Sequence, residues 1–419
     1  MDIIRKEKHE IEIRNQEGEI IDINEQPLLT MSTLGRISNG KTTLVKSYTG
    51  KSVMKYSKEM KKNMTIKLGF TNIKFYKCET CESPKCYQIN KETCEKCNTN
   101  NTLVLHASLM DSPGHTDLME TALSGAASMD FCLLLLSTDC EQDLDSNEHY
   151  KAIKILNLEE STIILHNKLD LISKETALEN YNKIKKMYNP KYIIPTCIQF
   201  GIGLDYLTQF IVESIPNPIN EKLQEKINSP LKASIIRSFD TNKPGTKVED
   251  MVGSVVGVII RTKYLKINDV IKIVPGIISS NGNNYPVEAR ITSLKTDNTK
   301  LKVAYPGGLI GVGLSIDPAL AKDDRLVGNY IISPDDKTNK IFKKCTIEFT
   351  KYDENLKLKK KELCTLMLSS IKRVIKINSI DENQITVTSM TAMAGELNDK
   401  VIVMKSNHIE IYGKIIDIE

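Results

Sequence analysis

The chemistry of this sequence begins with a glycine-rich stretch, GRISNGKTT, which runs from Gly35 to Thr43. Its spacing is that of a loop whose backbone N–H groups surround a polyphosphate, with Gly35 and Gly40 permitting close approach. In such a loop the Lys41 ammonium meets the β- and γ-phosphates, and the Thr42 hydroxyl ligates Mg²⁺. The stretch follows an apolar run and precedes a helical pattern, so it predicts a phosphate-binding loop, with a chance glycine-rich turn as the alternative.

A second motif, DSPGH, runs from Asp111 to His115 and ends another apolar run. A carboxylate at the end of a buried strand can hold Mg²⁺ through water. Gly114 can offer its N–H to a γ-phosphate and act as a hinge that senses its loss. His115 then lies beside the attacking water, although alone it would be a surface or capping histidine. A GTPase also needs a mobile threonine that reaches Mg²⁺, in the sequence between these two motifs. Thr65 is the candidate, with Thr71 as second choice.

The third motif, NKLD, covers Asn167 to Asp170 and follows a buried strand. Ligands of open α/β sheets bind beyond the carboxyl ends of the strands. The Asp170 carboxylate can accept both N1–H and N2–H of guanine, which adenine does not offer in that arrangement. Asn167 can bond the other edge of the base, and the Lys168 stem can cover the ring. The motif NKLD is common by chance. Because here it follows the phosphate-binding loop and DSPGH along the chain, it predicts that the base is guanine, and hence that GTP and GDP are the ligands.

Residues 76–98 hold five of the ten cysteines of the chain. Two CxxC pairs, separated by twelve residues, suit a Zn²⁺ ion held by four thiolates. Cys86 is an extra thiol that could replace one ligand, and reduced cysteines without metal are the alternative. The predicted zinc ligands are Cys78, Cys81, Cys94 and Cys97.

The elements that position these motifs are predicted from the apolar patterns. Runs such as DFCLLLLST show no polar alternation, which is typical of buried parallel strands, and helical patterns separate them. We therefore expect an α/β GTPase domain with a mostly parallel sheet at 28–216, after a polar lead-in at 1–27. A proline-rich linker follows at 217–230. Short β-rich runs spaced by turn residues then predict two small all-β barrels, domain II at 231–333 and domain III at 334–419.

Composition narrows the class of protein. The chain has 419 residues and a formal net charge of +4, which alone does not indicate a nucleic-acid partner. The charged N-terminus lacks a signal-peptide pattern, and the longest apolar run, at 129–136, is too short to span a bilayer. The other cysteines are scattered and show no disulfide framework. We expect a soluble, cytoplasmic protein without a membrane partner.

Taken together, the motifs resemble the translational GTPases, and within them the family of gamma subunits of eukaryotic and archaeal initiation factor 2. In that family a cysteine knuckle lies between the two switch regions, as it does here. The stretches DTNKPG and DPALAKDDRLVGN also look like those of its second domain, and they separate it from elongation factors Tu and 1 alpha. The third domain is the weakest match.

The resemblance implies roles for individual residues. Thr42 and Thr65 fall on the family's Mg²⁺ ligands, Asp111 on its water-mediated Mg²⁺ position, and His115 on the histidine that positions the hydrolytic water. Arg36, Ser38 and Asn39 depart from the family's usual loop side chains, but the backbone cradle should survive. The implied GTP-binding residues are Gly35, Ser38, Asn39, Gly40, Lys41, Thr42, Thr43, Asn167, Lys168 and Asp170, with Cys197, Ile198 and Gln199 where the family has Ser-Ala-Gln.

The implied function is GTP-driven delivery of initiator methionyl-tRNA to the small ribosomal subunit, inside a heterotrimer with alpha and beta subunits. Hydrolysis is slow alone and needs a GTPase-activating protein, and exchange factors act on the nucleotide. Three alternatives remain. A selenocysteine-specific elongation factor would be expected to carry a further C-terminal domain. The GTPase subunit of a sulfate-adenylylating enzyme is disfavoured by the knuckle. A GTP-binding scaffold that no longer hydrolyses GTP would bind without turnover.

Overall fold

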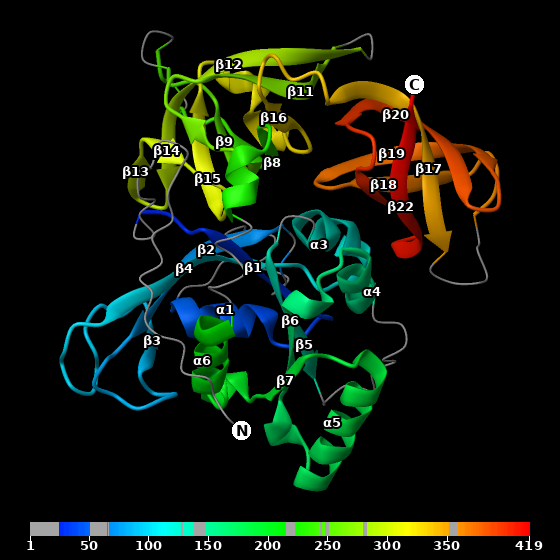
Figure 1. Cartoon of the computed structure of the whole chain (residues 1–419). Helices are drawn as coiled ribbons and strands as arrows, with labels where there is room; N and C mark the ends of the chain where they lie inside the picture. Colours follow the sequence, from blue (N-terminus) through cyan, green and yellow to red (C-terminus); the bar gives the residue numbers. More distant parts are fainter. Residues whose placement is uncertain are drawn as a thin grey trace.

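The computed structural model of the chain consists of a nucleotide-binding part and two β-barrels (Figure 1). It describes residues 25–50, 65, 67–126, 129–137, 148–214, 223–243, 245–247, 251–279, 283–351 and 358–419. Most of the polar lead-in lies outside these residues. In the described part of the chain, no helix is both long enough and apolar enough to cross a membrane.

The first part is a seven-stranded sheet in the order β3-β2-β4-β1-β5-β6-β7. The pairings among β4, β1, β5, β6 and β7 are parallel, whereas β2 runs antiparallel to β3 and β4. The fold class expected of this part, α/β with a mostly parallel sheet, is therefore confirmed. The strands are β1 (Leu29–Leu34), β2 (Gly69–Lys77), β3 (Tyr87–Ile89), β4 (Thr102–Asp111), β5 (Phe131–Ser137), β6 (Thr162–Asn167) and β7 (Tyr192–Pro195).

The central strands are buried along their whole length, which matches their unbroken apolar sequences. Helices cover the sheet, and their ends follow local signals. In α5, for example, the Ser173 hydroxyl caps the first turn by accepting from the Thr176 N–H at 3.3 Å, and Asn189 ends the helix in the left-handed region. The helices are α1 (Lys41–Thr49), α3 (Met119–Ala126), α4 (Glu148–Ile155), α5 (Lys174–Tyr188) and α6 (Leu204–Ser214), with short 3₁₀ turns η1 (Thr116–Leu118), η3 (Glu159–Ser161), η4 (Leu169–Leu171) and η5 (Ile198–Phe200).

The first barrel closes through β11-β16-β8-β9-β15-β12 and back to β11, with β13 added to β12. Its aliphatic core comes from alternate residues of these strands. The elements are β8 (Lys232–Phe239), β9 (Val255–Thr262), β10 (Leu265–Lys266), β11 (Val270–Ile278), β12 (Asn284–Thr296), β13 (Thr299–Leu301), β14 (Val303–Ala304), β15 (Leu309–Leu314), η7 (Pro318–Leu320), η8 (Lys322–Asp324) and β16 (Tyr330–Ile332).

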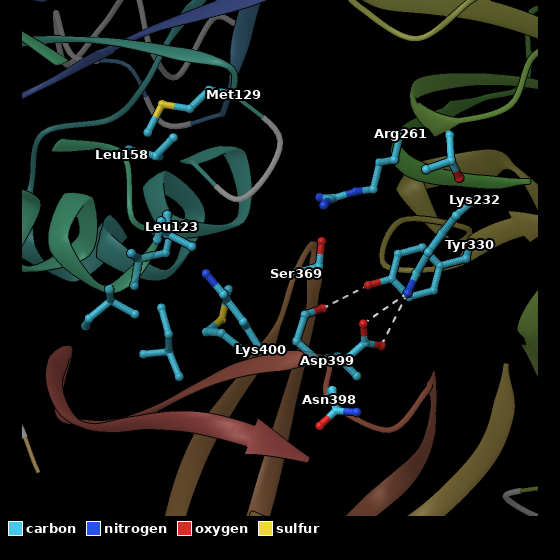
Figure 2. A pocket seen from close by; sticks show the side chains of 16 residues that line it. Leu123, Met129, Leu158, Lys232, Arg261, Tyr330, Ser369, Asn398, Asp399 and Lys400 are labelled. Carbon is cyan, nitrogen blue, oxygen red and sulfur yellow. Dashed lines mark hydrogen bonds and ion pairs between the residues drawn. The ribbon is translucent and has the colours of Figure 1, made fainter. Parts of the chain in front are cut away.

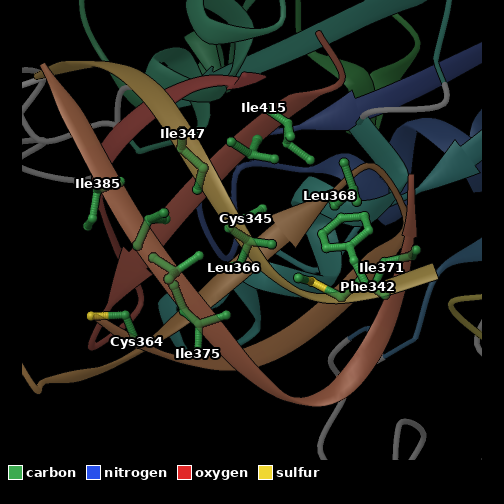
Figure 3. Close-up of a cluster of buried hydrophobic side chains, with 14 of the residues drawn as sticks. Phe342, Cys345, Ile347, Cys364, Leu366, Leu368, Ile371, Ile375, Ile385 and Ile415 are labelled. Carbon is green, nitrogen blue, oxygen red and sulfur yellow. The ribbon is translucent and has the colours of Figure 1, made fainter. Parts of the chain in front are cut away.

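The second barrel closes through β17-β20-β19-β18-β21-β22. Figure 3 shows its core, in which Ile347, Leu366 and Ile375 from different strands point to the same interior. Two all-β barrels after the α/β part were expected, and both are confirmed. The strands are β17 (Lys340–Lys351), β18 (Leu363–Leu368), β19 (Ile371–Ile380), β20 (Gln384–Gly395), β21 (Lys400–Lys405) and β22 (His408–Ile418).

Two segments near the predicted domain boundaries pack against the first barrel. Gln26, at the end of the lead-in, exchanges hydrogen bonds with the backbone of Tyr305, at 3.2 and 3.0 Å. Residues 223–228 are helical, and Leu223 and Ile227 are buried with Leu28 and Tyr305. Part of the segment expected to be a linker therefore helps to join the sheet to the first barrel.

Candidate nucleotide-binding site

The predicted motifs converge at one edge of the sheet. The phosphate-binding loop follows β1, DSPGH begins at the end of β4, NKLD begins at the end of β6, and TCIQ follows β7. These strands are parallel, so their carboxyl ends meet at the same edge. Four segments that lie between Gly35 and Gln199 thus form one site.

The phosphate-binding loop requires glycine at two positions. Gly35 has φ 135°, and a side chain there would collide with the carbonyl of Leu135. Gly40 has φ 101°, and a Cβ would lie 2.5 Å from the Asn167 amide nitrogen. The Asn39 side chain donates to the Leu135 carbonyl at 2.7 Å, which fixes the loop on β5. The loop then enters α1, whose first N–H groups are suited to an anion.

Lys41 lies beneath this loop. Its ammonium donates to the carbonyls of Gly35 at 2.8 Å and Arg36 at 2.7 Å. Burial lowers the pKa of Lys41 to about 8, although Asp111 acts in the opposite direction. A buried cation with only carbonyl partners would be further stabilised by phosphate oxygens, which fits the predicted role.

The predicted Mg²⁺ ligands come together around one carboxylate. The hydroxyls of Thr42 and Thr65 both donate to Asp111 Oδ2, at 2.8 and 3.0 Å, and lie 3.2 Å from each other. Thr33 donates to the other oxygen of Asp111 at 3.2 Å. Burial raises the pKa of Asp111, while these hydroxyls and Lys41 partly offset the effect. Such a cluster of oxygens suits Mg²⁺. Thr71, the second choice, lies within β2.

Gly114 packs directly against the phosphate-binding loop. A Cβ at this position would collide with the Lys41 ammonium and lie 2.8 Å from the Gly35 carbonyl oxygen. His115 is half-exposed beside it, and its Nδ1 accepts from the Asp117 N–H at 3.1 Å. Gly114 thus lies where it could contact a γ-phosphate, while the role of His115 stays a prediction.

A histidine that the sequence motifs missed also reaches this loop. His149, in the first turn of α4, is buried and hydrogen-bonded to the Gly114 backbone. Burial lowers the pKa of His149 to about 3, and Lys41 and Arg36 act in the same direction, so the imidazole is neutral near pH 7. In the sequence, the one signal for His149 is that a histidine occupies a position of a helical pattern that faces the core.

The guanine motif forms a connected network. Asn167 donates to the Asn39 carbonyl at 2.9 Å, and its oxygen accepts from the Ile198 N–H at 3.1 Å. Asp170 is exposed, and its carboxylate accepts from the Cys197 thiol at 2.7 Å. The carboxylate that is predicted to recognise the base is therefore accessible, while the Cys197 thiol holds it in place.

The remaining predicted residues of this region flank that network. Lys168 has φ 66°, which turns the chain between Asn167 and Asp170. Gln199 is exposed in η5, next to the buried Ile198. Ser38 is exposed in the phosphate-binding loop, and Thr43 is half-buried in α1. The structure thus places all predicted nucleotide-binding residues around one site.

The four predicted zinc ligands also come together. Their sulfur atoms all lie within 4.8 Å of one another, with single distances of 3.4 Å from Cys78 to Cys97 and 3.7 Å from Cys81 to Cys94. A tetrahedral ZnS₄ centre with Zn–S bonds of about 2.3 Å requires sulfur atoms about 3.8 Å apart, so the residues fit the ion. Cys86 is buried nearby but is not in this group.

Polar donors surround these sulfur atoms. The Gln88 amide donates to Cys94 at 3.0 Å, and the hydroxyls of Thr80 and Thr99 lie 2.9 and 3.0 Å from Cys97. Such contacts stabilise thiolates around a metal. The knuckle is tied to the sheet by β3 and to α6 by the hydroxyl of Tyr87, which donates to Glu213 at 2.9 Å. These contacts anchor the knuckle on the sheet and on α6.

We expect the double variant Cys78→Ser, Cys81→Ser to lose a bound zinc ion, because two of four thiolates disappear. Elemental analysis of the purified chain should find about one zinc per chain before the change and almost none after it. The matched control is Cys132→Ser, a buried cysteine of β5. A metal content that is the same in the double variant and the parent would contradict the site.

Comparisons with known proteins agree with this geometry. The family model described as "Elongation factor Tu GTP binding domain" matches residues 26–396. The gamma subunit of eukaryotic translation initiation factor 2 from Encephalitozoon cuniculi is 35% identical over 93% of this chain and 92% of its own length. The gamma subunit from Schizosaccharomyces pombe is 40% identical over 74% and 72%, and that of translation initiation factor 2 from Methanococcus maripaludis is 39% identical over 73% and 75%.

Solved structures show the same fold at lower identity. The translation elongation factor SelB from Methanococcus maripaludis, solved with a GTP analogue, has a TM-score of 0.69 and 18% identity, and the match covers 94% of this chain and 80% of that one. A bacterial selenocysteine-specific elongation factor has a TM-score of 0.65 and 19% identity, over 93% and 58%. At this identity the likeness supports the arrangement of sheet and barrels and does not assign a substrate.

Proposed function

The chain belongs to the family of gamma subunits of translation initiation factor 2, a family of GTPases, and we propose that it delivers initiator methionyl-tRNA to the small ribosomal subunit. In this proposal it acts in the cytoplasm, together with alpha and beta subunits and with GTPase-activating and nucleotide-exchange factors. Domain boundaries at 28–216, 231–333 and 334–419 are part of the same proposal.

The observation that carries the proposal is the meeting of Thr42, Thr65 and Asp111 beneath the phosphate-binding loop. GTP with Mg²⁺ would supply a γ-phosphate whose presence or loss is the signal. Thr65 would report on that phosphate through the metal, and Gly114 through its backbone N–H. His149 would hold the Gly114 segment, and the half-exposed His115 would turn toward the attacking water.

The signal has a direct route to the first barrel. Lys67, two residues after Thr65, forms an ion pair with Asp324 at 2.6 Å. Asp324 also accepts from Arg237 Nε at 3.1 Å and from the Ser238 N–H at 3.0 Å. A change at Thr65 would therefore alter how the first barrel is held against the sheet. We propose that this barrel and the nucleotide-binding part enclose the aminoacyl end of the tRNA.

The second barrel is linked to the segment that follows Gly114. Side chains of α3 and α4, including Leu123 and Ile155, are buried against Met367, Ile402 and Ile409 of the barrel. At the start of α4, Glu148 accepts from the Ile409 N–H at 3.3 Å. Loss of the γ-phosphate would thus act on both barrels, through Lys67 and through α3 and α4.

We expect Lys67→Ala to reduce the preference of tRNA for the GTP-bound form over the GDP-bound form. Lys67 is partly exposed, so the pair contributes modestly to stability, and folding and nucleotide affinity should be nearly unchanged. A double-mutant cycle with Asp324→Asn, read out by tRNA binding, isolates the pair. Lys74→Ala, on β2, is the control. Additive effects of Lys67→Ala and Asp324→Asn would contradict the route.

The proposed function is tested by filter binding of charged initiator tRNA and charged elongator tRNA, each with GTP and with GDP. We expect tight binding of the initiator tRNA with GTP alone. Equal binding of both tRNAs, or no effect of the nucleotide, would contradict the proposal. Hydrolysis assayed with ribosomal subunits and an activating protein separates the GTPase from a scaffold that binds GTP without turnover.

A further inference from the structure

A cavity of about 450 Å³ lies where the nucleotide-binding part and both barrels meet (Figure 2). Its lining comes from α3 and α4, from β8, β9 and β16, and from β18 and β21. The volume is in the range of sites that enclose small organic ligands. Among the described residues that line it, none belongs to the nucleotide or zinc sites, so it is a separate feature of the molecule.

One side of the cavity is apolar. It is built from residues of α3 and α4, from residues beside these two helices, and from β18 and β21 of the second barrel. This side can cover the hydrocarbon body of a ligand. The residues are Leu123, Met129, Ile155, Leu156, Leu158, Met367 and Ile402.

The other side is polar and already organised. The Lys232 ammonium lies 3.1 Å from Asp399 Oδ1 and 2.7 Å from Glu396 Oε1. The Tyr330 hydroxyl donates to the Leu368 carbonyl at 3.3 Å. Lys232 of the first barrel thus pairs with the carboxylates of Glu396 and Asp399 of the second barrel, and these ion pairs join the two barrels at the rim of the cavity.

Arg261 gives this side a further positive charge. Its Nε donates to the Ser234 hydroxyl at 2.8 Å, and Figure 2 shows its guanidinium reaching into the space that Ser369 also faces. Burial lowers the pKa of Arg261, yet a guanidinium stays charged at neutral pH. A partly buried cation is stabilised by an anion that brings matching hydrogen bonds, and Lys400, exposed at the rim, adds to the positive charge.

We propose that this cavity binds an amphipathic organic anion, whose acidic group pairs with Arg261 and whose apolar body packs against Leu123, Ile155 and Met367. Such a ligand contacts all three parts of the chain at once. It would therefore stabilise their present arrangement and oppose any movement of α3 and α4 relative to the barrels. The inference concerns a second ligand and does not depend on tRNA delivery.

The test uses anilinonaphthalene sulfonate, an aromatic anion that fluoresces in apolar surroundings, with the full chain saturated with GDP and Mg²⁺. We expect one saturable site, from which decanoate displaces the dye. Decanol, of the same length without the charge, should displace it at least about tenfold less well, because the charge-assisted bond to Arg261 is missing. Equal competition by decanoate and decanol, or the absence of saturable binding, would overturn the proposal.

Arg261→Gln should weaken dye binding by about tenfold or more, while Arg290→Gln, a change at an exposed arginine of β12, should leave it unchanged. If Arg261→Gln does not fold, Leu158→Trp fills the apolar side and should also remove binding. Circular dichroism and GDP binding report on folding of each variant. Unchanged dye affinity in a folded Arg261→Gln or Leu158→Trp variant would place the dye elsewhere and refute the site.

Discussion

Asp170→Asn is expected to lower the affinity of the chain for GTP and GDP by roughly 10²- to 10⁴-fold. The carboxylate is exposed beside Ile198 and Cys197, where it can accept two N–H groups of guanine. An amide keeps the shape but replaces one acceptor with a donor. The loss of two hydrogen bonds to a charged group costs about 3–6 kcal/mol.

The same change should improve binding of xanthosine nucleotides, because xanthine carries a carbonyl where guanine carries the amino group. Calorimetry with GDP and xanthosine diphosphate measures both effects. Asp381→Asn, at an exposed position between β19 and β20, is the matched control. If Asp170→Asn reduced the affinity for both nucleotides alike, Asp170 would not be the residue that reads the base.

Gly114→Ala is expected to slow stimulated GTP hydrolysis by about 10²- to 10³-fold, the size of effect seen when one positioned N–H donor is lost. The new methyl group would collide with the Lys41 ammonium and lie 2.8 Å from the Gly35 carbonyl oxygen, so the segment must move away from the phosphate-binding loop. Binding of GDP should change little, because it relies on that loop and on NKLD.

Single-turnover hydrolysis and separate titrations with GDP and a GTP analogue measure these effects. Gly311→Ala on β15 is the control, since a Cβ there would lie 3.5 Å from the Lys295 carbonyl oxygen, an ordinary contact. The initiator tRNA should also bind the Gly114→Ala variant without regard to the nucleotide. A variant that hydrolyses GTP at the parent rate would show that Gly114 does not approach the γ-phosphate.

The site was largely predictable because its motifs are local. Gly35 and Gly40 satisfy a backbone requirement within a single loop, and the CxxC pairs place ligands at fixed short spacings. The two barrels were predictable for a similar reason, since alternating apolar residues specify strands with one buried face. Cys86 could not be separated from the other cysteines by spacing, because only the folded knuckle sets which sulfur atoms meet.

Other features depended on long-range packing. The strand β2 was not predicted, because its mixed sequence GFTNIKFYK gains its strand partners only from β3 and β4. His149 was likewise missed, since its contact with Gly114 joins residues far apart in the chain. The pairing of Lys67 with Asp324 spans more than half of the chain and has no local signal.

The sequence thus predicts the chemistry of this protein from local patterns: a guanine nucleotide on a phosphate-binding loop, Mg²⁺ held by hydroxyls and a carboxylate, and a four-cysteine knuckle. Each of these features depends on residue types at short spacing, because the backbone geometry of a short stretch fixes how the residues of a motif lie relative to one another. The contacts of Lys67, α3 and α4 with the two barrels, and the cavity lined by Arg261 among the three parts, became visible in the folded structure alone. Those features arise where segments far apart in the sequence pack together, and no single stretch of the chain predicts such packing.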